Sequence, residues 1–249
     1  MAMSNKVMID IGKVLQFVKA RGFFAGFERF RVDNYDMNNA LEVITAIGRT
    51  RSPHFVIDDE NRFAYVNFIK WCHGDNTMKA LDPITGEEIQ GDLKRGIYIA
   101  GNTGSGKSWC LEVMLVYAQA WGFKIRFEED KDSRPLFWAI NRADDICHEY
   151  LNQGEIHRFK KMQIIGIQDF GQEPKETLYM GNRLNVLQQL LEYRGDRGDQ
   201  LTLITSNLRI SSETLKRDYG DRVQSRLVEM CNYFEIKGKD RRKMQKYEQ

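Results

Sequence analysis

The sequence has few cysteines, only four in 249 residues, and no long apolar run. Cys72, Cys110, Cys147 and Cys231 are far apart, so no pair has the close spacing of a zinc site or a redox motif. They are predicted to be reduced thiols packed as small hydrophobic residues, as in a reducing cytosol. No segment reaches the roughly 20 apolar residues of a transmembrane helix. The first residues also lack the apolar core of a signal peptide. These absences predict a cytoplasmic protein with no membrane partner.

A strong charge of one sign is also missing. Lysine and arginine number 37 against 35 aspartate and glutamate residues, which gives a formal net charge of +2. The overall electrostatic field therefore does not favour nucleic-acid binding, and a nucleic-acid site would need basic residues clustered in one place. With 42% hydrophobic residues, the chain is long enough to bury a sizeable core without disulfides or metals.

From residue 96 onward, short apolar segments alternate with longer segments of helical periodicity. Strands are predicted at 96–101, 123–128, 162–169, 201–207 and 233–238, and helices at 107–122, 143–154, 177–195 and within 211–230. This alternation predicts a three-layer αβα domain with a central parallel sheet. Ligands of such sheets bind beyond the carboxyl ends of the strands.

Residues 1–52 are predicted to form a small, mostly helical N-terminal region, and 53–249 the αβα domain. Pro53 marks the boundary, because the residue before a proline avoids helical geometry. Phenylalanine and basic residues interleave in KARGFFAGFERFR (19–31). They are interpreted as the buried face of a helix pair, with single-stranded DNA binding as the alternative.

The stretch GNTGSGKS follows a predicted strand and opens a predicted helix. It matches the phosphate-loop motif G-x-x-x-x-G-K-[ST] in full. The glycines let consecutive backbone N–H groups face a phosphate, while Lys107 reaches the β- and γ-phosphates and Ser108 ligates Mg²⁺. ATP and Mg²⁺ are the predicted ligands. The predicted nucleotide-binding residues are Gly101, Asn102, Thr103, Gly104, Ser105, Gly106, Lys107, Ser108 and Trp109.

Polar residues further along the chain fit the same chemistry. Asn207 ends the predicted strand at 201–207, where an amide can position an attacking water. Arg222 and Arg226 are four apart on one helix face, and they can reach a neighbouring subunit's site if the protein assembles. The turn RGDRGDQ (194–200) carries Arg194 and Arg197, interpreted as exposed charges, with a DNA-facing role as the alternative.

The ordered series GNTGSGKS, IIGIQDFGQE, ITSNL, YGDRVQSRL and GKDRR resembles the DnaC/IstB family of AAA+ ATPases, over roughly residues 95–243. The family contains bacterial and phage helicase loaders and transposition helper proteins. The resemblance implies an AAA+ fold, ATP as ligand and an ATP-dependent homo-oligomer. It also implies single-stranded or duplex DNA, and a replicative helicase or a transposase, as partners.

The resemblance also assigns roles to individual residues. It implies that Asn207 is a polar sensor and that Arg226 is an arginine finger, with Arg222 beside it. Arg241 or Arg242 would be a second sensor, contacting the γ-phosphate within the same chain. The N-terminal region would bind the protein partner.

One position departs from the family pattern, in which the strand ends in two adjacent acids. Here Gln168 precedes Asp169. In one alignment Gln168 takes the metal position and Asp169 polarises the attacking water, which predicts slow hydrolysis. In the other, a one-residue shift brings Asp169 to the metal and leaves Glu173 as the nearest spare acid. Such a shift would turn Ile165 and Ile167 off their buried face.

The predicted function is therefore that of an ATPase that loads a helicase in DNA replication, with catalytic residues Lys107, Asp169, Asn207 and Arg226. A transposition helper is the alternative within the family. A nucleotide-gated scaffold that never hydrolyses ATP and a phosphate-loop small-molecule kinase are the alternatives from other classes.

Overall fold

The computed structural model describes residues 10–20, 26–238 and 240–241. In these residues seven strands form the central sheet, in the order β3-β2-β12-β4-β11-β8-β7. The strands from β12 to β7 are parallel, and β2 and β3 add an antiparallel edge. Their bounds are β2 Lys79–Leu81, β3 Glu88–Gln90, β4 Gly96–Gly101, β7 Ala139–Arg142, β8 Ile164–Phe170, β11 Leu201–Ser206 and β12 Cys231–Ile236.

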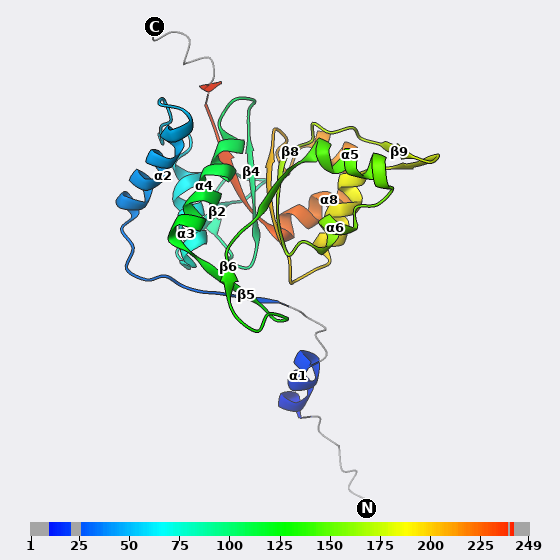
Figure 1. Cartoon of the computed structure of the whole chain (residues 1–249), viewed down its shortest axis with the longest axis horizontal. Coiled ribbons are helices and arrows are strands. Elements are labelled where there is room, and N and C mark those ends of the chain that lie inside the picture. The colour runs from blue at the N-terminus through cyan, green and yellow to red at the C-terminus, as the bar shows by residue number, and fades with distance from the viewer. Residues whose placement is uncertain (1–9, 21–25, 239, 242–249) are drawn as a thin grey trace, which may run out of the picture.

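Helices cover both faces of this sheet, with α2, α3 and α4 on one side and α5 to α8 on the other (Figure 1). Alternate residues of β4 divide between the two layers, since Ile97 and Ile99 join the first apolar cluster while Tyr98 and Ala100 join the second. The predicted three-layer αβα fold is thus confirmed. The helices are α2 Met37–Arg51, α3 Arg62–His73, α4 Lys107–Trp121, α5 Ala143–Gln153, α6 His157–Lys161, α7 Val186–Gly195 and α8 Glu213–Met230.

The order of the strands decides which loops meet at the phosphate-loop edge. β11 lies between β4 and β8, although 99 residues separate the end of β4 at Gly101 from the start of β11 at Leu201. The residues at or just after the carboxyl ends of β4, β11 and β8 therefore come together at one edge of the sheet. These are the phosphate loop, Asn207 and the segment around Asp169.

The strand predicted at 123–128 exists as β5, Lys124–Phe127, but it lies outside the central sheet. It pairs antiparallel with β1 (Phe27–Arg29) and β6 (Arg134–Pro135). The residues of β5 alternate between exposed and buried, as in a strand with one covered face, whereas the central parallel strands are buried on both faces. The edge position beside β8 is taken by β7, which the sequence pattern did not predict.

The helix predicted at 177–195 begins later than expected. Residues 177–184 form a hairpin of β9 (Thr177–Tyr179) and β10 (Asn182–Leu184), and α7 begins after the cap residue Asn185. The two linking residues, Met180 and Gly181, both have positive φ, 45° and 86°. Such two-residue turns suit the twist of a hairpin. Gly181 was the signal in the sequence that could have identified it.

The N-terminal region contains helices α1 (Ile11–Ala20) and α2, but β1 interrupts the predicted helix pair. Phe27 is buried in β1 against Phe127 of β5, so tertiary pairing overrides the local helical pattern. Phe23 and Phe24 lie outside the described residues. α2 contributes Ala40, Leu41 and Ile44 to the same apolar cluster as α4, and the division of the chain at residue 52 stays a prediction.

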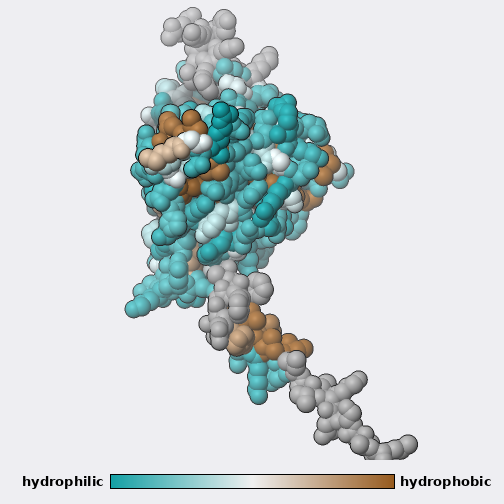
Figure 2. Space-filling view, turned by 90° about the vertical axis from the view of Figure 1, so that its right-hand side faces the viewer, coloured by the Kyte–Doolittle hydropathy of each residue, from teal (hydrophilic) through white to brown (hydrophobic). Residues whose placement is uncertain are grey.

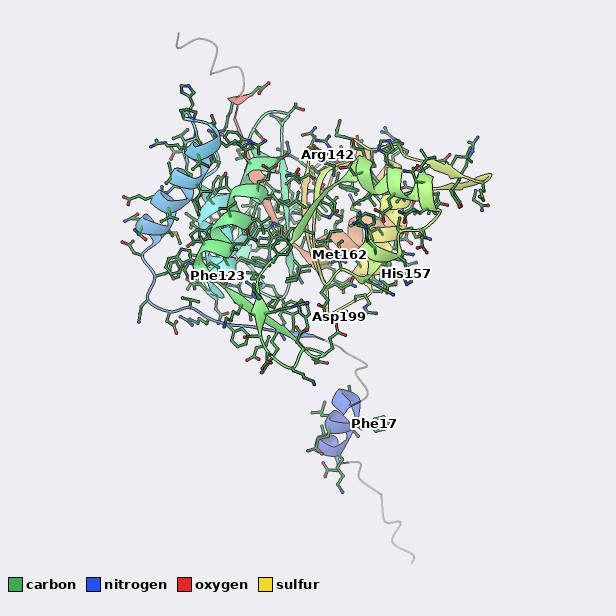
Figure 3. The ribbon with its side chains drawn as sticks, in the orientation of Figure 1. Phe17, Phe123, Arg142, His157, Met162 and Asp199 are labelled. Atoms are coloured by element: carbon green, nitrogen blue, oxygen red, sulfur yellow. The ribbon has the colours of Figure 1, made fainter. Side chains whose placement is uncertain are left out.

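Apolar side chains gather on the surface of α1 (Figure 2), and Figure 3 labels one of them, Phe17. The exposed ones are Ile11, Val14, Leu15 and Phe17. Among the described residues, no helix has the length and apolar character that crossing a membrane requires. The four cysteines are free and buried, as predicted.

Arg194 is not the exposed turn charge that its sequence context suggested. Its side chain is 1% exposed, and its guanidinium donates hydrogen bonds to the Thr202 hydroxyl and to main-chain carbonyls, including that of Leu201. Further carbonyl acceptors belong to Phe159, Met162 and Gln163. Burial lowers the pKa of Arg194 to about 9. The side chain therefore joins the end of α7 to β11 and to the segment before β8.

Replacing Arg194 by methionine is expected to lower the free energy of unfolding by about 2 to 3 kcal/mol, because several buried carbonyls lose their donors. Urea denaturation measures the change. The matched control is Arg197→Met, because Arg197 is 43% exposed and pairs with Asp199, so its loss should cost less than about 1 kcal/mol. Equal effects of the two substitutions would contradict the structural role of Arg194.

Candidate functional site: the phosphate-loop edge

The phosphate loop joins a strand to a helix, since β4 ends at Gly101, α4 begins at Lys107, and residues 102–106 lie between them. Gly104 and Gly106 have φ angles of 78° and 102°, a region that favours glycine. The Ser105 side chain is buried beneath the loop, and its hydroxyl has no hydrogen-bond partner among the described residues. The backbone is thus bent as a phosphate cradle requires, at the N-terminus of a 15-residue helix.

The Lys107 side chain lies within this loop and is 5% exposed. Its ammonium group donates to the Asn102 carbonyl and to the amide oxygen of Asn207, both at 2.7 Å. Asn207 in turn donates to the Thr103 hydroxyl at 3.3 Å. The structure therefore brings together the predicted lysine and the predicted polar sensor, from β11, at one side of the phosphate loop.

Asp169 reaches the loop because of a β-bulge. In the pairing of β8 with β11, Ile167 faces Ile204 and Phe170 faces Ser206, so two residues of β8 lie opposite Thr205 alone. Asp169 has φ 58°, and its backbone N–H donates to the Thr205 hydroxyl. The extra residue turns the carboxylate toward α4, where it accepts from the Ser108 hydroxyl at 3.5 Å.

This bulge resolves the one-residue offset in the sequence. A shift of the whole strand was expected to move Ile165 and Ile167 off their buried face. Both are fully buried, because the bulge takes up the extra residue after Ile167 and leaves the register before it unchanged. The flipped strand of the shifted alignment is therefore not seen, and which of the two alignments describes the role of Asp169 stays a prediction.

Gln168 does not contact the Ser108 hydroxyl. Its amide nitrogen donates to the Glu112 carboxylate at 2.9 Å and to the Ser108 carbonyl at 3.3 Å, and its side chain is buried at 6% exposure. Glu112 also pairs with Arg51 of α2. A carboxylate at position 168 would face Glu112, and two adjacent carboxylates raise each other's pKa. A neutral donor suits this position, which gives a physical reason for the glutamine.

Arg142 is a residue of this site that sequence reasoning missed. It ends β7, opposite Gln168 in the register, and Figure 3 labels it where the chain enters α5. Its guanidinium lies 3.4 Å from Asp169 and 3.1 Å from Asp144. Asp144 foremost, and Asp169 to a smaller degree, raise the pKa of Arg142. Because the strand at 139–142 was not predicted, nothing in the sequence pattern indicated that this arginine lies beside Asp169.

Glu173, the spare acid of the alternative alignment, is occupied elsewhere. It is buried, accepts from the backbone N–H of Gly171 at 2.8 Å, and accepts from the Tyr219 hydroxyl of α8. Lys175 also donates to the Tyr219 hydroxyl, at 2.9 Å. The structure therefore gives Glu173 a packing role between the end of β8 and α8.

Arg222 and Arg226 do not reach the phosphate loop of their own chain. Arg226 pairs with Asp196 and, at 2.9 Å, with Glu229, and these carboxylates raise its pKa. Arg222 lies 3.3 Å from Asp196. Arg226 also lines a cavity of about 330 Å³ together with Lys94 and Arg95, which precede β4 at its amino end. The two arginines are thus near the opposite edge of the sheet from the loop.

Arg241 does lie on the phosphate loop. Its backbone N–H donates to the Gly104 carbonyl at 3.0 Å, and its Nε donates to the Ser105 carbonyl at 3.1 Å. Its two terminal nitrogens donate to Asp58, whose pKa this arginine lowers. Arg242, the alternative for the same role, lies outside the described residues.

Trp109, the last of the predicted nucleotide-binding residues, packs away from the loop. Its ring stacks on Phe55 with a centroid distance of 5.7 Å, and Arg51 lies over it. Its predicted contact with nucleotide stays a prediction.

The donor set at this edge fits a magnesium-bound triphosphate. Lys107, the loop N–H groups and Arg241 supply positive charge, and Ser108 with Asp169 supplies oxygen ligands of the kind Mg²⁺ prefers. Within the described ranges, no three or more His, Cys, Asp or Glu side chains gather into a metal site. A metal here would therefore take its remaining ligands from phosphate and water.

No protein-family model matches the sequence, and no curated protein matches it. The structure is similar to a crystal structure of the DnaC helicase loader, at 15% identity and a TM-score of 0.47, covering 74% of this chain and 94% of that one. It is also similar to the replication initiator DnaA bound to AMPPCP and single-stranded DNA, at 18% identity and a TM-score of 0.45 over 75% of this chain. AMPPCP-bound DnaA from Aquifex aeolicus is similar at 17% identity and a TM-score of 0.44 over 79% of this chain.

The chain spans 49% and 54% of the two DnaA chains. At these low identities and TM-scores, the likeness assigns no role to any residue here.

Proposed function

We propose that the protein is an AAA+ ATPase of the helicase-loader type, which binds ATP with Mg²⁺ and hydrolyses it slowly. The observation that supports the proposal is that four polar side chains lie together at the phosphate loop, which two glycines with positive φ bend. Lys107 contacts Asn207, and Ser108 contacts Asp169. Three strand ends that are distant in sequence supply these side chains to one edge of the sheet.

Each of these side chains has a task that follows from its chemistry. Lys107 would leave the Asn102 carbonyl for the β- and γ-phosphate oxygens, while Ser108 and Asp169 would hold Mg²⁺, whose charge would offset that of the phosphates. Asn207, already bonded to Lys107, would orient water toward the terminal phosphate. Hydrolysis would be slow because the neutral Gln168 stands where a second acid is usual, which leaves Asp169 to serve both metal and water.

Within this proposal, ATP holds copies of the chain together around DNA or a replicative helicase, and hydrolysis resets the assembly. Arg226, with Arg222 beside it, would complete the site of the next copy, which accords with their distance from the loop of their own chain. Residues 1–52 would bind the protein partner. An arginine supplied from a neighbour is effective because it neutralises charge that develops during phosphoryl transfer.

Replacing Arg226 by alanine is expected to lower ATP turnover about hundredfold and to abolish ATP-dependent assembly, while ATP binding by the single chain persists. Light scattering with an uncleavable ATP analogue measures assembly, and phosphate release measures turnover. Arg217→Ala is the matched control, because Arg217 is an exposed arginine of the same helix that pairs with Asp218.

A protein that stays monomeric with the ATP analogue at every concentration, and whose turnover is unchanged by Arg226→Ala, would contradict the loader proposal. A solitary nucleotide binder would then remain. Capture of a replicative helicase with ATP but not with ADP would support the loader, and capture of a transposase would favour a transposition helper. Phosphate transfer to a small acceptor would instead identify a kinase.

If ATP drives assembly without any measurable hydrolysis, the protein is a nucleotide-gated scaffold. Gln168 favours the scaffold as a second candidate function, because its amide can neither ligate a metal as a carboxylate does nor accept a proton.

A further inference from the structure

Arg241 and Asp58 form a paired contact beside the phosphate loop. The Nη2 and Nη1 atoms of Arg241 donate to the two Asp58 carboxylate oxygens at 2.7 and 2.8 Å, a bidentate geometry. The Nε of the same side chain donates to Ser105 in the loop. One guanidinium therefore joins the loop to a residue 183 positions earlier in the chain.

Asp58 is itself held in place. Its carboxylate accepts from the backbone N–H of Glu60 at 3.1 Å, and its own N–H donates to the Asn61 side chain at 2.9 Å. The Lys237 N–H donates to the Glu60 carbonyl at 3.0 Å, so the segment after β12 lies against residues 58–61. The Arg241 side chain is thus held from two sides, by the phosphate loop and by the turn before α3.

The pairing does not use all the donors of Arg241. A guanidinium has five N–H groups, and Ser105 and Asp58 together take three, so one N–H remains on each terminal nitrogen. These can donate to a phosphate oxygen without breaking the contact with Asp58. A long side chain that is already ordered loses less conformational entropy when it binds.

We propose that Asp58 is a positioning residue that holds Arg241 at the phosphate loop and thereby sets the preference for a triphosphate over a diphosphate. This inference rests on the proposed nucleotide site. Asp58 touches no phosphate in it and acts through Arg241 alone. The loop residues hold the phosphates that ATP and ADP share, whereas Arg241 senses the terminal one.

The test compares the dissociation constants of ATP and ADP, by displacement of a fluorescent ADP analogue from the full chain. Asp58→Asn keeps the size of the side chain but removes its charge, and it is expected to weaken ATP binding about tenfold while ADP binding changes by less than about twofold. Asp59→Asn is the matched control, because Asp59 is exposed, adjacent and outside these bonds. It should leave the ratio of the ATP to the ADP dissociation constant unchanged.

A double-substitution cycle separates positioning from general packing. Arg241→Ala should raise the ratio of the ATP to the ADP dissociation constant, as Asp58→Asn does, and adding Asp58→Asn to it should produce no further change. Equal weakening of ATP and ADP by Asp58→Asn would overturn the inference, as would additive effects in the cycle. Tighter ATP binding would also overturn it, because Asp58 would then compete with the phosphate for Arg241.

Measuring Lys107→Ala in the same assay shows whether the nucleotide site is wrong or only the role of Asp58 is wrong. If it leaves both nucleotides bound, the phosphate-loop site itself is wrong, and the inference is overturned with it. If it weakens both while Asp58→Asn leaves the ratio unchanged, the nucleotide site stands and the role of Asp58 alone is wrong.

Discussion

Replacing Lys107 by alanine is expected to weaken ATP binding by more than about a hundredfold, because two charge-assisted hydrogen bonds to the phosphates are lost. The fold should persist. The atoms that Lys107 contacts, the Asn102 carbonyl and the Asn207 amide, belong to exposed residues that water can reach. Isothermal titration with ATP and Mg²⁺ measures the loss, and thermal unfolding verifies that the variant is folded.

Lys216→Ala is the matched control for this substitution. Lys216 is an exposed lysine of α8 that pairs with Asp221, so its removal changes the net charge equally and touches no part of the loop. ATP affinity should be unchanged. Tight ATP binding by a folded Lys107→Ala protein would show that the nucleotide binds elsewhere on the protein.

Replacing Asp169 by asparagine is expected to lower ATP turnover about a thousandfold while ATP affinity changes by only a few-fold, since an amide neither accepts a proton nor ligates Mg²⁺ as a carboxylate does. Asparagine is chosen because it tolerates the left-handed conformation that Asp169 adopts in the bulge, with φ 58°. The bulge and the contact with Thr205 should therefore survive. Single-turnover phosphate release measures the effect.

The control is Glu176→Gln, an equal change of charge at an exposed residue that pairs with Arg183 a short distance along the chain. Turnover by Asp169→Asn at the rate of the unmodified protein would remove Asp169 from the catalytic set. In that case the next carboxylates to test are Glu112, which contacts Gln168, and Asp144, which shares Arg142 with Asp169.

Several parts of this site were predictable because their signals are local. The phosphate loop lies between β4 and α4 at the predicted bounds, since a glycine-rich turn that joins a buried strand to a helix is specified by adjacent residues. The strand β11 and the position of Asn207 directly after it were predicted for the same reason, and so was the helix α5. In each case the residues that determine the structure are neighbours in the sequence.

Other parts depend on contacts between distant segments. The pattern of Lys124–Phe127 predicted a strand correctly, but nothing in it indicated that β1 would be its partner and that β7 would take the place beside β8. Arg194 resembles any charge at the end of a helix, and only the packing of β11 and the segment before β8 surrounds it with carbonyl groups.

The sequence alone determined that a phosphate-binding loop follows a buried strand, and that Asp169 stands one position later than the family pattern. The tertiary structure decided that this offset is absorbed by a bulge opposite Thr205, that Gln168 bonds to Glu112, and that Asp58 holds Arg241 over the loop. The physical reason is the range of the interactions. Backbone conformation and periodicity are set by neighbouring residues, whereas bulges, buried amides and ion pairs are fixed by whichever segment folds against them.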